Sequence, residues 1–140
     1  MRADSFWKLV LLLPMITACS SQPSARDLAK ELETIASWTA TAQMVGEARL
    51  KGSVPTVYAK QTLQTTQKEL DKESKTVAKV APAQARTKVI EQFQQLQQSV
   101  VSLEKAVETD DRTTLTHSLA RLSTQKQALE RLMKTSGEQL

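Results

Sequence analysis

The stretch VIEQFQQLQQSVVSLEKAV, residues 89–107, decides the fold. Its apolar residues recur at alternating steps of four and three: Val89, Phe93, Leu96, Val100, Leu103 and Val107. Because an α-helix turns once in about 3.6 residues, this spacing puts them on one face, in a seam of heptad type. Gln92, Gln95 and Gln97 lie between them and are interpreted as the polar face of this helix, able to hydrogen-bond a partner helix.

Three further segments carry an apolar stripe of the same kind. The stripes hold Leu28, Leu32, Ile35, Trp38, Ala42 and Val45 in the first segment, Ala59, Leu63, Thr66, Leu70, Ser74, Val77 and Val80 in the second, and Leu115, Leu119, Leu122, Lys126, Leu129 and Met133 in the last. Ala, Leu, Gln, Glu and Lys dominate these segments, and all five favour helix. Helix-breaking residues are few along this part of the chain: Gly46, Gly52, Pro55, Pro82 and Gly137.

Short motifs predict where the first two helices begin and end. Ser24 and Asp27 form an N-terminal capping signature. Gly52 is placed to end the first helix, because glycine readily adopts the conformation that closes a helix. Ser53 is then expected to cap the second helix, with Pro55 in its first turn.

Pro82 predicts the end, or a sharp kink, of the second helix. Asp110 and Asp111 supply capping oxygens and favourable charge at the start of the last helix. Four segments of about 25 residues with short connections predict an all-α, up-down-up-down four-helix bundle over residues 24–136. The alternative is an arrangement of extended helical hairpins, in which a long central helix kinks at Pro82 and the seam at 89–107 recruits a partner chain.

Residues 1–18 have the features of an export signal. Arg2 and Lys8 provide positive charge, and the apolar run from Leu9 to Ile16 is too short to cross the roughly 30 Å of a bilayer. The run leads into Ile16-Thr17-Ala18-Cys19, which resembles the lipobox of bacterial lipoproteins. The alternatives are a buried structural thiol at Cys19 and an ordinary secretory cleavage site nearby.

The lipobox resemblance covers residues 1–19 and implies a processing route. It implies cleavage between Ala18 and Cys19, diacylglycerol on the Cys19 sulfur, and usually an acyl chain such as palmitate on the new amino terminus. Residues 19–23 then form a lipidated cysteine and a short tether, which keeps the bundle close to the lipid headgroups. Ser20 stands where Asp marks inner-membrane retention, so resemblance to Gram-negative lipoproteins favours the outer membrane, facing the periplasm.

The composition argues against most catalytic and metal-binding classes. With one Cys and one His, the chain can form neither a disulfide framework nor a multi-histidine metal site. His117 follows Leu115 by two residues, which turns it to the solvent side, and pairing with Met44 as haem ligands is the weaker alternative. Nucleophile motifs and glycine-rich phosphate loops are also missing. The sequence therefore predicts a protein that is not an enzyme and has no cofactor.

The charge balance is modest, with 19 Lys and Arg against 15 Asp and Glu and a net charge of +4. It does not indicate a nucleic-acid-binding protein. One outward stripe on the second helix is basic and comprises Lys68, Lys72, Lys75 and Lys79. This stripe is interpreted either as a contact for anionic headgroups or as a solvated face, and the interleaved Glu69, Asp71 and Glu73 favour the second interpretation.

These observations predict a lipid-anchored, non-catalytic module that tethers or scaffolds a partner at the bacterial envelope. Trp38, Tyr58 and Phe93 are the only aromatic residues after Cys19, so the core looks thin. A protein partner on the second helix, or a homodimer, would bury what the fold leaves exposed. The alternative is a small-ligand-binding bundle, with the ligand in a cavity left by the threonine-rich second helix.

Overall fold

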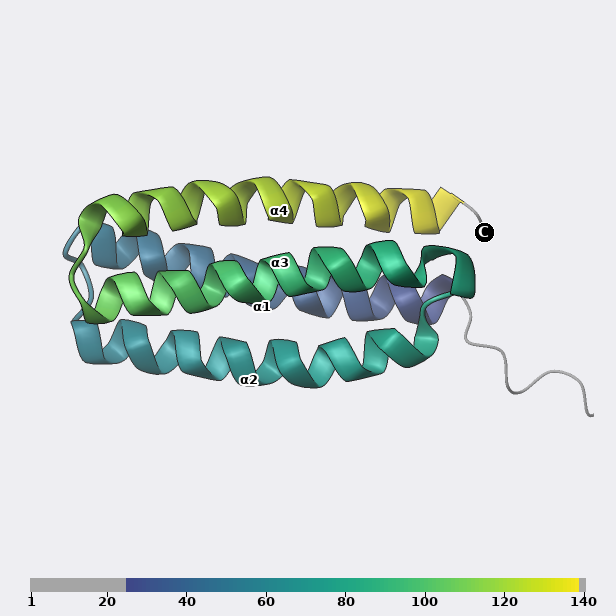
Figure 1. Cartoon of the computed structure of the whole chain (residues 1–140), viewed down its shortest axis with the longest axis horizontal. Coiled ribbons are helices and arrows are strands. Elements are labelled where there is room, and N and C mark those ends of the chain that lie inside the picture. Colours follow the sequence, from purple (N-terminus) through teal and green to yellow (C-terminus); the bar gives the residue numbers. More distant parts are fainter. Residues whose placement is uncertain (1–24, 139–140) are drawn as a thin grey trace, which may run out of the picture.

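A computed structural model describes residues 25–138. This part of the chain forms the helices α1 (Ala25–Leu50), α2 (Thr56–Val80), α3 (Ala83–Glu108) and α4 (Arg112–Glu138). Figure 1 shows the helices side by side, each running opposite to the next. Each packs against two neighbours, with α1 joined to both α2 and α4, and α1 and α3 meet more sparsely across the diagonal. The predicted up-down-up-down four-helix bundle is therefore confirmed, and the extended alternative is wrong.

The two ends of the bundle differ in what they contain. At one end α1 begins at Ala25, α2 turns into α3, and α4 finishes, and we call this the terminal end (Figure 1). At the other end lie the α1–α2 and α3–α4 connections, and we call this the loop end. The helix α4 runs through Gly137 to Glu138, slightly beyond the predicted boundary at residue 136.

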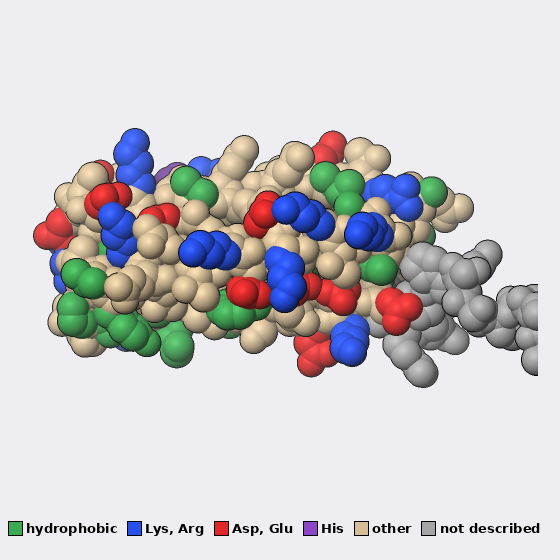
Figure 2. Space-filling view, turned by 90° about the horizontal axis from the view of Figure 1, so that it is seen from below, with side chains coloured by type: hydrophobic (Ala, Val, Ile, Leu, Met, Phe, Trp, Pro, Cys, Tyr) green, Lys and Arg blue, Asp and Glu red, His purple; other side chains and the backbone are tan. Residues whose placement is uncertain are grey.

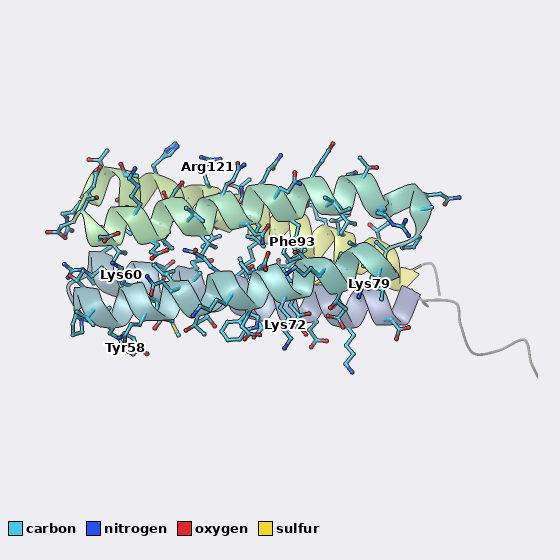
Figure 3. All side chains as sticks on the ribbon, turned by 60° about the horizontal axis from the view of Figure 1, so that its bottom comes forward. Tyr58, Lys60, Lys72, Lys79, Phe93 and Arg121 are labelled. Atoms are coloured by element: carbon cyan, nitrogen blue, oxygen red, sulfur yellow. The ribbon has the colours of Figure 1, made fainter. Side chains whose placement is uncertain are left out.

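The apolar core draws on all four predicted stripes. The α3 seam is buried along its whole length, from Val89 to Val107, and Phe93 projects inward from it (Figure 3). Several predicted stripe positions are only half-buried: Trp38, Ser74, Val80, Lys126 and Met133. They lie at stripe edges or near helix ends, where large or polar side chains keep part of their surface in water.

Small polar residues also occupy the core. The hydroxyls of the fully buried Thr39 and Thr66 donate to the carbonyl oxygens of Ile35 and Thr62, at 2.8 and 3.0 Å. Bonding back to the preceding turn satisfies each hydroxyl, so a threonine fills an interior position without an unpaired polar group. The sequence predicted an interior position for Thr66 but not for Thr39 or for the buried Ser99, whose hydroxyl has no hydrogen-bond partner among the described residues.

The α1–α2 connection closes as the sequence predicts. Gly52 has a φ of 73°, and its N–H donates to Arg49 O at 3.0 Å while Ser53 N–H donates to Ala48 O at 2.8 Å. This pair of bonds is a Schellman motif, which satisfies the last carbonyls of α1. Ser53 is therefore part of the closing turn and does not cap α2, which begins after Pro55 without a side-chain capping bond.

The α3–α4 connection uses the two aspartates for different tasks. Asp110 has a φ of 51° and closes α3, with its N–H donating to Val107 O and Asp111 N–H donating to Ala106 O. Asp111 then caps α4, because its carboxylate accepts bonds from Thr114 N–H at 3.0 Å and from Thr114 Oγ1 at 2.6 Å. The predicted capping role is thus correct for Asp111, whereas Asp110 ends the preceding helix.

Pro82 breaks the chain sharply between α2 and α3. Ala81, directly before it, has a ψ of 131°, the extended conformation that a following proline favours. The side chain of Arg86 closes the corner, since its Nη2 donates to Ala81 O at 3.1 Å. The break lets α3 fold back along α2 and excludes one continuous central helix.

Gly46 lies inside α1 and serves close packing. A Cβ at this position would lie 2.7 Å from Leu119 Cδ2 of α4 and 3.2 Å from Leu103 Cδ1 of α3. The absence of a side chain therefore allows three helices to approach near the loop end. Helix propensity alone would favour alanine here by about 1 kcal/mol.

We expect Gly46→Ala to destabilise the bundle by about 1–2 kcal/mol. The added methyl group overpacks the core, and the cost of this overpacking exceeds the stabilisation that alanine gains from its higher helix propensity. Urea unfolding followed by circular dichroism measures the change. In a Leu119→Ala background, which removes the nearest atom, the same substitution should cost less. An equal cost in both backgrounds would contradict the steric explanation.

The Asp111 cap gives the stability a defined pH dependence. The two Thr114 bonds hold the pKa of Asp111 below its usual value. The carboxylate therefore stabilises the fold above about pH 4, and this contribution is lost as the pH falls through the lowered pKa. Asp111→Ala should lower the Tm by a few degrees at pH 7 and progressively less in acid. Asp111→Asn retains an acceptor and should lose less, so equal losses for both variants would contradict the capping role.

Candidate functional site

The residues that resemble a lipobox, including Ala18 and Cys19, lie outside the described residues, as does the predicted cap Ser24. The structure does place the point at which the chain enters the bundle. Ala25 begins α1 at the terminal end, beside the α2–α3 corner and the last turn of α4 (Figure 1). Anything attached shortly before Ala25 is therefore close to this end.

The predicted lysine stripe lies along the exposed side of α2. Lys68, Lys72, Lys75 and Lys79 are all exposed. Lys72 Nζ lies 3.8 Å from Glu69 Oε2, and Lys75 Nζ lies 3.2 Å from Asp71 Oδ2. Figure 2 shows basic and acidic side chains interleaved over this side of the bundle. The middle of the stripe is thus a mixed-charge surface, and its role as an anionic contact stays a prediction.

Glu73 of α2 faces Glu31 of α1. A hydrogen bond between the two carboxyl groups, together with partial burial and charge repulsion, raises the pKa of Glu73 above its usual value. Lys72 opposes this shift only weakly. Two carboxylates this close repel each other when both are ionised, so the α1–α2 contact carries a charge conflict at neutral pH.

The loop end is tied together by polar contacts between helices. Arg49 Nη2 lies 3.1 Å from Asp110 Oδ1, which links the two connections, and Lys60 Nζ lies 2.7 Å from Glu108 Oε1. The second contact raises the pKa of Lys60 and lowers that of Glu108. Each pair joins a partly buried cation to an exposed carboxylate, so solvent still screens the attraction and the pairs align neighbouring helices more than they stabilise the fold.

Exposed apolar side chains gather toward the loop end. The large hydrophobic residues with more than half of their surface exposed are Met44, Val57, Tyr58 and Val101. All four lie in the half of the bundle away from the terminal end. Figure 2 shows hydrophobic side chains clustered at the loop end of the α2 side, and Figure 3 shows Tyr58 pointing outward there. The sequence signal was available, because these residues fall off the buried stripes.

His117 is exposed on α4, as the sequence predicted.

Among the described side chains, no cluster of three or more His, Cys, Asp or Glu could hold a metal ion. No helix within residues 25–138 has a hydrophobic stretch suited to spanning a bilayer.

The spaces within and between the helices are small or shallow. A cavity of about 10 Å³ between α1, α3 and α4 is lined by Leu32, Phe93 and Gln125 among others, and could hold about one water molecule. An open groove of about 250 Å³ runs between α2 and α3, with Val77 and Ile90 in its walls. On the interior side of α2, Thr66 fills its position, so this threonine leaves no ligand-sized cavity.

Comparison of the chain with protein-family models, with curated proteins and with solved structures finds no significant match.

We expect Glu73→Gln to stabilise the protein at pH 7, by less than about 1 kcal/mol, because it removes the repulsion with Glu31 and supplies an amide donor. Since the pKa of Glu73 is raised, the repulsion is present at neutral pH and is relieved as the pH falls through that pKa. The gain measured by thermal melting should therefore shrink in acid. Glu33→Gln, at an exposed position on α1, is the matched control and should show no such gain.

Proposed function

We propose that this protein is a lipid-anchored, non-catalytic module of the bacterial envelope that presents its loop end to a protein partner. The observation that carries the proposal is that the two ends of the bundle carry different features. The chain enters at the terminal end, whereas the large exposed hydrophobic side chains lie toward the loop end.

The anchor follows from the resemblance of Ile16-Thr17-Ala18-Cys19 to a lipobox. Cys19 and Ala25 are six residues apart, so the lipid-bearing residue lies within about 20 Å of the start of α1 in any conformation. Two or more acyl chains hold a protein stably at a membrane surface. The terminal end then faces the bilayer, and the outer membrane, on its periplasmic side, is the favoured location.

The surface offered to a partner lies around Met44, Val57 and Tyr58, which we call the loop-end patch. Tyr58 is 54% exposed and Met44 is 63% exposed, although both are apolar enough to favour burial. Helices of about 25 residues rise roughly 38 Å, so the patch stands well clear of the headgroups. A hetero-protein or a second copy of the chain could cover it, and both would bury apolar surface that water now contacts.

A catalytic role has little support in the described residues. The pKa shifts at Lys60, Glu108 and Asp111 arise from exposed ion pairs or helix capping, not from a convergent site in a cleft. The ligand-binding alternative is not favoured either, because the interior cavity holds about one water molecule and the larger hollows, including the polar one between α3 and α4 at Gln98 and Arg121, are open to solvent.

We expect the native chain, expressed in a Gram-negative host, to carry acyl mass on Cys19 and to fractionate with membranes. Cys19→Ala should abolish both, as measured by mass spectrometry and fractionation. A photo-crosslinking residue at position 58 should then give one discrete adduct in envelopes, whereas the same residue at the exposed position 124, half-way along α4, should not. An unmodified Cys19 would contradict the anchor, and equal labelling from both positions would contradict the loop-end patch.

A further inference from the structure

The terminal end of the bundle is distinctly basic. Within about two helical turns of this end, at residues 27–32, 74–90 and 128–135, the described side chains include seven Lys and Arg against three Asp and Glu. The corresponding part of the loop end, residues 43–63 and 101–119, has five of each. The positive charge of the bundle is therefore concentrated at the end where the chain enters.

The α2–α3 corner, residues 74–90, carries most of this excess and contains no acidic residue. We call it the basic corner, and its cations are Lys75, Lys79, Arg86 and Lys88. Lys75 is paired with Asp71, and Arg86 bonds to the backbone at Ala81. Lys79 and Lys88 are exposed and make no ion pair with another described side chain. Arg131 and Lys134 are exposed on α4 at the same end.

The basic corner shares Lys75 and Lys79 with the lysine stripe but lies nearer the terminal end than the rest of that stripe. Figure 3 shows Lys79 toward the terminal end of α2 and Lys72 nearer the middle of the helix. Lys68 lies eleven residues before Lys79, or about 17 Å along the axis. This distance exceeds the screening length of about 8 Å at physiological ionic strength, so a charged plane at the terminal end attracts Lys79 but hardly affects Lys68.

We propose that the basic corner lies against anionic lipid headgroups, and so holds the bundle upright on its membrane with the loop end outward. This inference rests on the proposed lipid anchor, which brings the terminal end to the bilayer. An anchor at a single point would by itself allow the bundle to tilt or lie flat. Lysines near a negatively charged surface favour one orientation, because each gains attraction within the screening length.

The test uses the acylated protein in vesicles of phosphatidylglycerol and phosphatidylethanolamine that contain quencher-labelled lipid. A fluorophore on a cysteine introduced by Gln84→Cys, at the corner, should be strongly quenched. One introduced by Ser53→Cys, in the α1–α2 connection, should not be. Quenching at position 84 should fall by more than half in the Lys79→Glu, Lys88→Glu, Lys134→Glu variant, and in neutral phosphatidylcholine vesicles.

The matched control is Lys51→Glu, Lys68→Glu, Lys105→Glu, which changes net charge equally at exposed lysines away from the terminal end. It should leave quenching at position 84 unchanged, and circular dichroism verifies that both variants remain folded. Equal loss in the two variants, or equal quenching in neutral and anionic vesicles, would overturn the proposal. The first result would show a general charge effect, and the second would show that tether proximity alone is responsible.

Failure of the lipid anchor is distinguishable from failure of the basic corner. Mass spectrometry reports acylation of Cys19 independently of any vesicle measurement. If Cys19 carries no lipid, sedimentation of the chain with the same vesicles tests the corner directly. Retention on anionic vesicles that only the corner variant loses would support headgroup binding, whereas no retention would overturn it.

Discussion

The structure depends on one constraint: each helix has a single apolar face that must be covered by two neighbours at once. Leu32, Leu63, Leu103 and Leu122, one from each helix, are fully buried. All four faces are buried only when α4 packs against α1, so that every helix has two neighbours. The hydrophobic effect that drives this closure has no direction of its own, so turns and close contacts must select the arrangement. Gly46 and the break at Pro82 supply that selection within the described chain.

Much of the fold could be predicted from the sequence, because its strongest signals are local. The steps of four and three in residues 89–107 identified a buried face, and Gly52 marked a closing turn. Ser53 and Asp110 close the preceding helix instead of capping the next one, and the other errors concern features set by neighbouring helices. Gly46 resembled a helix breaker until the approach of Leu119 showed why a side chain is absent. Spacing alone also could not distinguish a core position from a stripe edge, as Lys126 and Trp38 show.

The candidate surfaces were less predictable than the fold. The sequence identified a lysine stripe on α2, but which cations lie near Ala25 depends on how α2 and α3 meet at Pro82. The pairing of Glu31 with Glu73 likewise joins helices that are far apart in sequence. The charge pattern along one helix therefore predicts which face of that helix is charged. The bundle topology determines at which end of the molecule those charges lie. The resemblance to a lipobox at residues 16–19 is different, because it depends only on consecutive residues, and it stays a prediction.

The two connections at the loop end have a consequence for recognition. Both use a residue with positive φ, Gly52 or Asp110, and both return the chain through bonds to the preceding helix. The backbone next to Val57 and Tyr58 is thus already ordered by a short turn that is bonded to the end of α1. A protein that docks there binds a preorganised surface, so association does not carry the entropic cost of ordering a long loop. Binding strength would then depend on the fit of side chains to a fixed frame.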